Sequence, residues 1–444
     1  MALTGRTALL AALGALVVGL LLPSWTGIGL VTGAVLIAVA VDLVLAAPVR
    51  SLRFGRGGDT TVRLGEPATV ELTVTNPSGR LLRGLVRDAW APSAWRPGTA
   101  EAASRHTLAL PGGERRRITT VLTPTRRGDH HAHRVTVRSL GPLGLAGRQG
   151  SHLVPWTVRA LPPFASRKHL PSRLARLREL DGRTSVLTRG QGTEFDSLRE
   201  YLPGDDIRSI DWRASARRAA NTATGAGGIA VRTWRPERDR HILVVLDTGR
   251  TSAGRVGDAP RLDAALDAAL LLTALATRAG DRVDLLAHDS RKRATVAGSS
   301  AHEVLPAFTN AMAGLEPALH ETDMRSLVAT ALKMAPQRSL IVLLTGLDAA
   351  PVEDGLRPLL PMLTKRHEVV LASVADPQLD VLAAGRGTLE AVYGAAAAEQ
   401  TRADRRATAE RLTRHGVTVL DAPPARIAPA LADTYLALKA AGRL

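Results

Sequence analysis

The chain has 444 residues, which exceeds the length at which a single hydrophobic core usually stops growing, so two or three domains are expected. Its 58 lysines and arginines against 41 acidic residues give a formal charge of +17, which suits nucleic acid or anionic lipid, although arginine-rich coding bias explains it equally well. Aromatic residues make up only 3%, so base-stacking surfaces are scarce and lipid is favoured over nucleic acid. Cysteine is absent, which excludes disulfides, thiolate metal sites and cysteine nucleophiles.

Two apolar runs, residues 7–22 and 27–47, open the chain and are separated only by the letters PSWT. Spans of this length joined so tightly predict a transmembrane helical hairpin over residues 1–50, because each backbone must satisfy its own hydrogen bonds in lipid. A cleaved signal peptide is the alternative. No small-residue cleavage site followed by a hydrophilic mature start is present, which favours the retained hairpin.

Charged residues around the hairpin indicate its orientation. The turn is uncharged, whereas Arg6 precedes the first run and Arg50 and Arg53 follow the second, so both ends are expected in the cytoplasm. Asp42 lies inside the second run, and we expect it to snorkel to the inner interface or to contact the partner helix. The bulk of the chain is therefore predicted to be cytoplasmic.

A β-rich module is predicted over residues 51–160. The letters TTVRLGEPATVELTVTNPSGR alternate apolar and polar residues and close on a turn, and ERRRITTVLTPTRRGDHHAHRVTVRSL repeats the pattern. Several short strands of this kind indicate an immunoglobulin-like β-sandwich. Residues 161–190 form a basic connector, in which PSRLARLRELDGR predicts an amphipathic helix that packs on the next domain or lies on anionic lipid.

Residues 191–240 begin with a dense run of charges. Phe195, Leu198 and Leu202 fall at helical spacing, which predicts a short helix over residues 193–202 with one buried face. The proline and glycine that follow end this helix, and Trp212 is expected to be a large buried anchor beside Ile210. We expect the whole segment to pack on the last domain.

The charges of this segment nearly balance between positions 194 and 218. Six carboxylates (Glu194, Asp196, Glu200, Asp205, Asp206 and Asp211) accompany five arginines (Arg199, Arg208, Arg213, Arg217 and Arg218). Balance is typical of an internally paired network, since an unmatched buried charge is costly. No histidine lies nearby, so the segment does not indicate a catalytic site.

The letters GTEFDSLREYLPGDDIRSIDWRASAR resemble the signature of the bacterial domain of unknown function 58 family, G-x-E-F-x-x-L-R-x-Y-x-x-G-D-x-x-R-x-I-D-W-x-x-x-A-R. The candidate signature or partner-binding residues are Glu194, Phe195, Arg199, Tyr201, Gly204, Asp205, Arg208, Asp211, Trp212 and Arg217. The resemblance implies a multidomain membrane protein of the bacterial inner membrane. Its parts would be an N-terminal transmembrane hairpin, a β-rich segment and a C-terminal von Willebrand A-like (Rossmann-like) α/β domain.

The sequence pattern of residues 241–444 predicts an α/β domain. The runs HILVVLD, DRVDLLAHD, SLIVLLTGL and EVVLASVAD read as buried strands, with helical stretches such as RLDAALDAALLLTALATRAG and DMRSLVATALKMA between them. Alternation of this kind predicts a mostly parallel sheet covered by helices on both faces, with ligands at the carboxyl ends of the strands.

The resemblance to von Willebrand A domains implies a metal site at Asp247. The family pattern D-x-S-x-S is followed by a distant threonine and a distant aspartate, whose oxygens suit a hard cation such as Mg²⁺. Asp247, Thr251 and Thr322 match, but glycines stand at 249 and 346 where a serine and an aspartate are expected, with Asp348 two residues later. The site is therefore degenerate: it either binds Mg²⁺ or serves as a metal-free contact surface.

No phosphate-binding Gly-rich loop, Gly-x-Ser-x-Gly elbow or zinc spacing occurs in the sequence, and no small-molecule substrate is indicated. We therefore expect a non-enzymatic, membrane-anchored adaptor. The family resemblance implies a MoxR-type AAA+ ATPase as partner, in assembly or remodelling of cell-envelope complexes. The alternative is a divalent-metal-dependent hydrolase or a metal-mediated ligand-binding protein. A nucleic-acid binder is not expected, because the arginines are spread over every segment.

Overall fold

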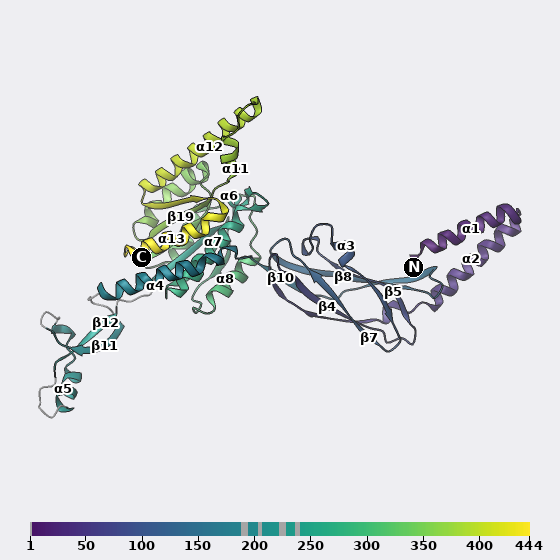
Figure 1. Ribbon diagram of the computed structural model, residues 1–444, viewed down its shortest axis with the longest axis horizontal. Helices are drawn as coiled ribbons and strands as arrows, with labels where there is room; N and C mark the ends of the chain where they lie inside the picture. The colour runs from purple at the N-terminus through teal and green to yellow at the C-terminus, as the bar shows by residue number, and fades with distance from the viewer. Residues whose placement is uncertain (1, 188–193, 203–206, 222–227, 236–239) are drawn as a thin grey trace. The chain divides into compact units, whose positions relative to one another are not determined.

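The computed structural model describes residues 2–187, 194–202, 207–221, 228–235 and 240–444 (Figure 1). The chain divides into two compact units, Met1–Pro163 and Phe164–Leu444. The protein is therefore multidomain, with mixed sheets in both units.

The N-terminal unit begins with two apolar helices, α1 (Gly5–Leu21) and α2 (Trp25–Leu45), which lie side by side (Figure 1). Ser24 caps α2 by accepting a hydrogen bond from the backbone N–H of Gly27 at 3.1 Å. In the described part of the chain, one helical stretch, Trp25–Ser51, is long and apolar enough to cross a membrane, and α1 is a shorter apolar helix.

Two sheets form the rest of this unit. The larger contains β1 (Ala2–Leu3), β3 (Thr61–Arg63), β5 (Leu82–Trp90), β6 (Arg105–Leu110), β8 (Gly128–Leu140), β9 (Ala146–His152) and β10 (Thr157–Leu161). The smaller contains β2 (Arg53–Gly58), β4 (Ala68–Thr75) and β7 (Arg115–Leu122), and a short helix, α3 (Ala100–Ala103), precedes β6. Alternate residues of both sheets, such as Leu72 and Val86, meet in one buried cluster, which explains the alternation in the sequence.

The C-terminal unit is built on a six-stranded sheet in the order β17-β16-β13-β18-β19-β20. Its strands are β13 (His241–Asp247), β16 (Arg282–His288), β17 (Lys292–Val296), β18 (Ser339–Leu344), β19 (Glu368–Val374) and β20 (Val417–Ala422), all parallel except β17. A hairpin of β14 (Arg255–Val256) and β15 (Ala259–Pro260) precedes helix α7 (Arg261–Arg278). The predicted parallel α/β sheet is thus present, with β17 as an antiparallel edge.

Helices cover both faces of this sheet. They are α4 (Leu170–Leu187), α6 (Arg250–Ala253), α7 (Arg261–Arg278), α8 (Val304–Ala313), α9 (Met324–Met334), α10 (Leu360–Thr364), α11 (Gln378–Ala383), α12 (Leu389–Arg414) and α13 (Pro424–Ala440). Val244 of β13 enters the core with α7 and α13, whereas Val245 enters the core with α9. Alternation along a central strand therefore supplies both cores, which explains its continuous apolar run. Leu177 of α4 is buried in the first core, so the basic connector packs on this domain.

The segment that carries the family signature forms an antiparallel pair, β11 (Glu194–Glu200) with β12 (Ala230–Arg235), and a helix, α5 (Trp212–Asn221). The predicted helix over residues 193–202 is therefore wrong. A β-bulge between Phe195 and Ser197 explains the error, because residues 195 and 198 pair with residues 234 and 232 of β12. Across the bulge, residues 195 and 198 are three positions apart in β11, whereas their partners in β12 are two positions apart. The apolar residues of this strand therefore have the spacing that is typical of a helix. The packing of this segment on the α/β domain stays a prediction.

Candidate functional site

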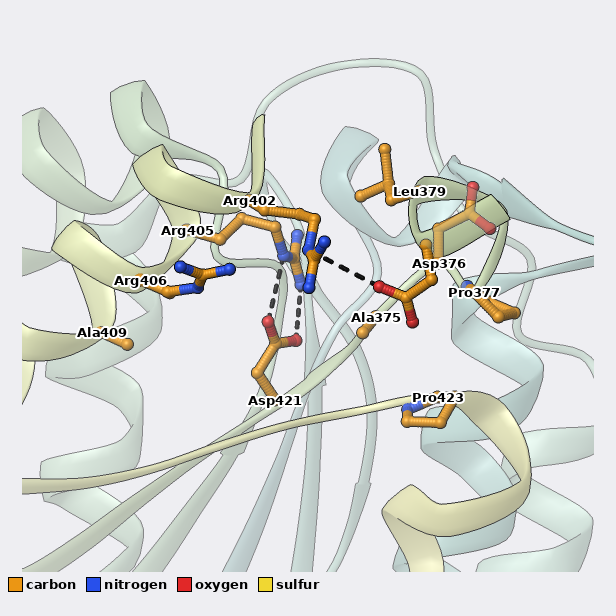
Figure 2. Close-up of a pocket in the computed structure, with 11 residues that line it drawn as sticks. Ala375, Asp376, Pro377, Leu379, Arg402, Arg405, Arg406, Ala409, Asp421 and Pro423 are labelled. Carbon is orange, nitrogen blue, oxygen red and sulfur yellow. Dashed lines mark hydrogen bonds and ion pairs between the residues drawn. The ribbon is translucent and has the colours of Figure 1, made fainter. Parts of the chain in front are cut away.

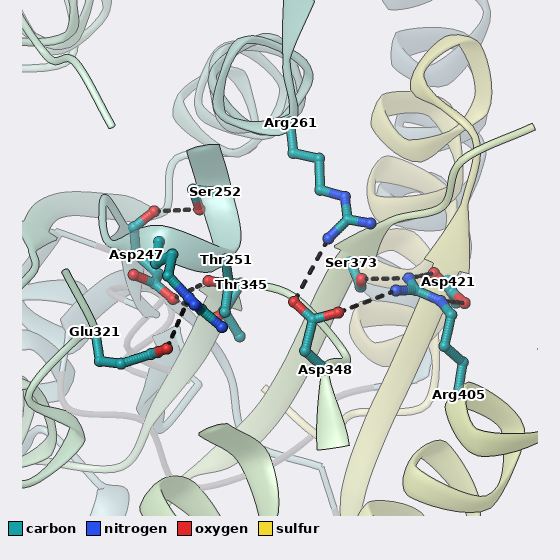
Figure 3. Close-up of polar contacts among 11 residues, drawn as sticks. Asp247, Thr251, Ser252, Arg261, Glu321, Thr345, Asp348, Ser373, Arg405 and Asp421 are labelled. Carbon is teal, nitrogen blue, oxygen red and sulfur yellow. Dashed lines mark hydrogen bonds and ion pairs between the residues drawn. The ribbon is translucent and has the colours of Figure 1, made fainter. Parts of the chain in front are cut away.

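Asp247 ends β13 at the carboxyl edge of the parallel sheet, and its side chain is fully buried. Oδ2 accepts hydrogen bonds from the hydroxyls of Thr251 at 2.8 Å and Thr345 at 2.5 Å (Figure 3). Oδ1 accepts from the backbone N–H of Gly249 at 2.8 Å and from the hydroxyl of Thr322. Four donors therefore occupy the four acceptor positions of this carboxylate. We call Asp247, Thr251, Thr322 and Thr345 the hydroxyl cluster.

Gly249 allows the cluster to close tightly. A Cβ atom at this position would lie 2.0 Å from the hydroxyl oxygen of Thr322, so a serine could not stand there without moving that threonine. The glycine that breaks the metal-site pattern is thus the residue that brings Thr322 within hydrogen-bond distance of Asp247. Relative to the family pattern, Gly249 lacks the serine hydroxyl but allows the segments that carry residues 249 and 322 to approach each other closely.

The structure brings together Asp247, Thr251 and Thr322, which the sequence singled out, and adds Thr345, which it did not. Thr345 directly follows β18, the strand beside β13. The available signal was its place in the letters LLTGLD, because carboxyl ends of neighbouring parallel strands meet at one edge.

The hydroxyl cluster does not fit a divalent cation as it stands. A hard cation needs oxygen lone pairs directed at it, whereas these three hydroxyls donate their protons to the one carboxylate. Asp348 could supply a second carboxylate, but it lies near Arg261 at 3.5 Å and Arg405 at 3.9 Å. Within the described residues, no group of three or more histidines and carboxylates could hold a metal ion.

Arg405 of α12 contacts the ends of two further strands at the carboxyl edge of the sheet, β19 and β20. Its side chain is buried, makes two hydrogen bonds of 2.6 and 3.1 Å to the carboxylate of Asp421, and donates to the hydroxyl of Ser373 at 2.9 Å (Figure 3). Such a bidentate pair fixes the guanidinium and satisfies most of its donors. Arg405 therefore holds the ends of β19 and β20 together beneath α12.

An open cavity of about 210 Å³ lies above Arg405, where β19 and β20 end (Figure 2). Its charged lining consists of Arg402, Arg405, Arg406, Asp376, Asp380 and Asp421. Arg402 lies 3.5 Å from Asp380, so the charges largely compensate one another within the cavity. No histidine is among the described residues that line it.

The signature segment exposes apolar side chains, among them Leu202 and Trp212, which were expected to be buried. Trp212 is 65% exposed, Ile207 is 69% exposed and Leu202 is 52% exposed, so the prediction of a buried anchor at Trp212 is wrong. A two-stranded sheet with one short helix has too little apolar surface to enclose a tryptophan. An exposed tryptophan among arginines has instead the composition of an interaction surface.

Asp211 organises the start of α5. Its Oδ1 accepts the backbone N–H groups of Arg213 and Ala214 at 3.0 Å, which caps the helix. Its Oδ2 lies 2.7 Å from Arg232 of β12. The N–H of Ala214 and the Arg232 guanidinium lower the pKa of the Asp211 carboxyl. This ion pair ties α5 to β12 and uses an arginine outside the counted set.

The other signature residues are placed as follows. The backbone N–H of Tyr201 donates to Ile229 at 2.7 Å, Arg199 donates to the carbonyl of Glu200 at 3.0 Å, and Arg208 and Arg217 are exposed. Glu194 and Phe195 belong to β11, but their side chains lie outside the described residues, as do Gly204 and Asp205 altogether. We call the described residues 198–202, 207–217 and 228–232 the signature module.

Comparison with known proteins finds a family model that matches part of the chain. Residues 197–417 match the family model described as "Protein of unknown function DUF58". This range begins inside the signature module and ends in β20, so the match spans the hydroxyl cluster as well.

Two curated relatives match part of the chain. The chain is 24% identical over 202 residues to "Uncharacterized protein YeaD" of Bacillus subtilis, covering 45% of this chain and 48% of that protein. It is 25% identical over 191 residues to "Uncharacterized protein Rv1480" of Mycobacterium tuberculosis, covering 43% of this chain and 57% of that protein. The chain therefore spans about half the length of the curated relatives it matches.

Solved structures resemble parts of the chain only distantly. The CARDB domain of the PF1109 protein from Pyrococcus furiosus, in complex with di-metal ions, is 18% identical, with 25% of this chain and 92% of that chain covered and a TM-score of 0.19. Proximal thread matrix protein 1 from the mussel byssus is 13% identical, with 46% and 47% covered and a TM-score of 0.28. At these scores the likeness carries no argument about function.

Proposed function

We propose that this protein is a membrane-anchored, non-enzymatic adaptor that docks a MoxR-type AAA+ ATPase through its signature module. The observation that carries the proposal is the exposure of Trp212 beside Arg213 and Arg217 on α5. Tryptophan and arginine dominate the energetics of protein interfaces, because both supply a large contact area and directional donors. A structural support would have buried the tryptophan.

The hydroxyl cluster supports a non-catalytic role. Asp247 is fully buried and its acceptors are all occupied, so it offers neither a free base nor an open coordination position. In this proposal the α/β unit is a von Willebrand A-like module whose site is closed by hydrogen bonds. Its role is to carry the signature module on a rigid core.

The apolar helices support the membrane anchor. We propose that α1 and α2 form a multi-pass hairpin in the bacterial inner membrane, with both ends of the hairpin and the bulk of the chain in the cytoplasm. Exposed apolar residues cover both helices over most of their length, and no other described part of the chain shields those residues from water. The immunoglobulin-like β-module would then be a spacer next to the membrane.

Co-purification from native membranes tests the adaptor. The protein is tagged at its C-terminus and recovered with and without Mg²⁺ and ATP, and the associated proteins are identified by mass spectrometry. Recovery of a MoxR-type ATPase in near-equal amount, lost on Trp212→Ser and kept on the surface control Leu389→Ser, is the expected result. Recovery of no ATPase in either condition, or equal recovery with Trp212→Ser, would refute it.

A second candidate is a divalent-metal-dependent hydrolase or ligand-binding protein. The observation in its favour is that one carboxylate and three hydroxyls converge at the carboxyl edge of the sheet, the chemical set that Mg²⁺ accepts. Binding of Mg²⁺ would require at least one hydroxyl to turn away from Asp247. Calorimetric titration with Mg²⁺, with Asp247→Asn as the negative control, distinguishes this metal-dependent function from the non-enzymatic adaptor.

A further inference from the structure

Hydrogen bonds join one end of the β-module to the apolar helices. Asp42 of α2 accepts the backbone N–H groups of Leu143 and Leu145, in the loop between β8 and β9, at 2.8 and 2.7 Å. The hydroxyl of Thr4, just before α1, donates to the carbonyl of Leu145 at 3.0 Å. We call this loop, residues 141–145, together with the loop between β4 and β5, residues 76–81, the helix-proximal loops.

Two arginines cap α2 at this end of the β-module. Arg148 of β9 donates to the carbonyl of Leu43 at 3.0 Å, and Arg80 donates to the carbonyl of Val44. Carbonyls in the last turn of a helix have no partner within the helix, so these bonds hold both guanidinium groups at the end of α2. A guanidinium has five N–H donors, and each cap uses one of them, which leaves donors for a further acceptor.

Two more arginines are exposed beside the helix-proximal loops. Arg6 of α1 approaches the second loop so closely that a Cβ atom at Gly144 would lie 3.0 Å from its Nη1. Arg83 of β5 is the cross-strand partner of the last residue of β8. The helix-proximal loops, which are described in full, contain no carboxylate, and the adjoining turn between β6 and β7 contributes Glu114. We call Arg6, Arg80, Arg83 and Arg148 the arginine collar.

Exposed leucines lie among these arginines. Leu81 and Leu143 of the helix-proximal loops are 54% and 51% exposed, and Leu3 of β1, which pairs with Ala146 of β9, is 64% exposed. Apolar side chains interleaved with cationic ones are typical of surfaces that lie in the headgroup region of a membrane, because the leucines enter the apolar boundary while the cations meet phosphates.

The lengths of the two helices bring this surface to the membrane. Helix α1 has 17 residues, or about 26 Å at the rise of an α-helix, and the part of α2 that precedes Asp42 is about as long. The hydrocarbon core of a bilayer is about 30 Å thick. Helices that cross it therefore have no length to spare, so the loops bonded to Thr4 and Asp42 must lie at the membrane surface.

We propose that the helix-proximal loops and the arginine collar form a contact surface for anionic phospholipids. Leu81 and Leu143 enter the interface, and the guanidinium groups bind headgroup phosphates, for which their planar array of donors is well suited. The inference rests on the membrane anchor proposed above and deepens it, since it names the lipid class and assigns part of the β-module to the membrane surface.

The depth of Leu143 in the membrane tests the position of the loops. The chain has no cysteine, so Leu143→Cys carries a single spin label. Leu153→Cys, at a 77% exposed position beyond the other end of β9, is the matched control. The full chain is placed in vesicles of phosphatidylglycerol and phosphatidylcholine, and collisions of the label with oxygen and with a water-soluble nickel complex are measured. We expect oxygen but not nickel to reach position 143, and nickel to reach position 153.

A third label separates this inference from the anchor itself. Leu36→Cys lies in the middle of α2, at an exposed position. Contact of this label with nickel would refute the membrane anchor and the inference with it. Protection at position 36 combined with equal access of nickel to positions 143 and 153 would keep the anchor and overturn the contact surface.

The lipid class is tested by native mass spectrometry of the full chain in neutral detergent, with phosphatidylglycerol or phosphatidylcholine added. Arg6→Gln/Arg83→Gln removes two collar charges that do not cap α2. The control, Arg87→Gln/Arg134→Gln, removes two exposed charges farther along β5 and β8, about 13 Å or more from Arg83 and beyond the roughly 8 Å range of charges at physiological salt.

We expect the unaltered chain and the control to bind phosphatidylglycerol about tenfold more tightly than phosphatidylcholine, since each arginine near the headgroups adds to the attraction. In Arg6→Gln/Arg83→Gln this preference should fall below about threefold, with the affinity for phosphatidylcholine unchanged. Equal affinity of the unaltered chain for the two lipids, or the same loss of preference in both variants, would overturn the proposal.

Discussion

The carboxylate of Asp42 and the backbone N–H of Leu145 lie 2.7 Å apart, although 103 positions separate the two residues in the sequence. The same carboxylate accepts from the N–H groups of Leu143 and Ala146, both at 2.8 Å. The expectation that Asp42 snorkels or contacts the other helix is therefore wrong. It attaches the end of an apolar helix to the loop after β8, and Gly141 is required there because a Cβ atom would lie 2.1 Å from Asp42 Oδ1.

Replacing Asp42 should loosen this attachment. Asp42→Leu leaves three buried N–H groups without an acceptor, at a cost of about 3 kcal/mol. We expect faster amide hydrogen exchange at residues 143–146, with partial protection in Asp42→Asn, which keeps one acceptor oxygen. Val44→Leu, at an exposed position of the same helix, serves as the control. Unchanged exchange in Asp42→Leu would show that the loop is held by other contacts.

The hydroxyl cluster predicts a cost for a conservative change. Thr345→Val keeps the shape of the side chain but removes one hydrogen bond to the buried Asp247, so the free energy of unfolding should fall by about 1–2 kcal/mol. Urea unfolding measures this free energy, with Thr401→Val at an exposed position as the control.

The same experiment separates the two candidate functions when it is repeated in millimolar Mg²⁺. The closed cluster predicts no effect of the ion on the unaltered chain. Stabilisation by Mg²⁺ that disappears in Thr345→Val would instead support the metal-dependent candidate, because a ligand that binds only the folded state raises its stability.

Asp284 predicts a dependence of stability on pH. Burial alone would raise the pKa of this carboxyl, but hydrogen bonds from His241 and Arg282 outweigh it, so the pKa is lowered from 3.8. A lowered folded-state pKa stabilises the protein above pH 3.8, and this contribution is lost as the pH falls through the folded value. Asp284→Asn should therefore destabilise the protein at neutral pH, with the difference shrinking in acid.

Thermal unfolding of Asp284→Asn between neutral pH and about pH 3 measures this change. Asp258→Asn, at an exposed position before β15, is the control. A deficit that stays constant over the whole range would mean that Asp284 acts through packing and not through its charge.

The sequence was informative where apolar runs had the length of a buried strand. His241–Asp247 and Glu368–Val374 form β13 and β19 within the predicted runs, because central parallel strands must be apolar on both faces. The edge strand β20 was not predicted, since its half-buried residues lack such a run. Alanine-rich α12 was also not predicted, because its exposed face gives no clear periodicity.

Contacts between distant segments account for most of what the sequence did not reveal. Thr345 and Thr322 meet Asp247 only after the parallel strands align, and Asp42 meets Leu145 only when a helix end reaches the β-domain. Local pattern misled at the signature module, where a bulge gave a strand the spacing of a helix. It also misplaced Trp212, because large aromatic residues are usually buried and this one is not.

The docking of an ATPase on the signature module is the central proposal, and Trp212 tests it most directly. The affinity of a purified MoxR-type ATPase from the same organism is measured against the full chain in nanodiscs, with Trp212→Ser and the exposed apolar control Leu389→Ser. The proposal predicts that Trp212→Ser weakens binding at least about thirtyfold, the loss of about 2 kcal/mol typical of an interface hot spot, and that the control binds normally. Equal affinity of all three proteins would contradict it.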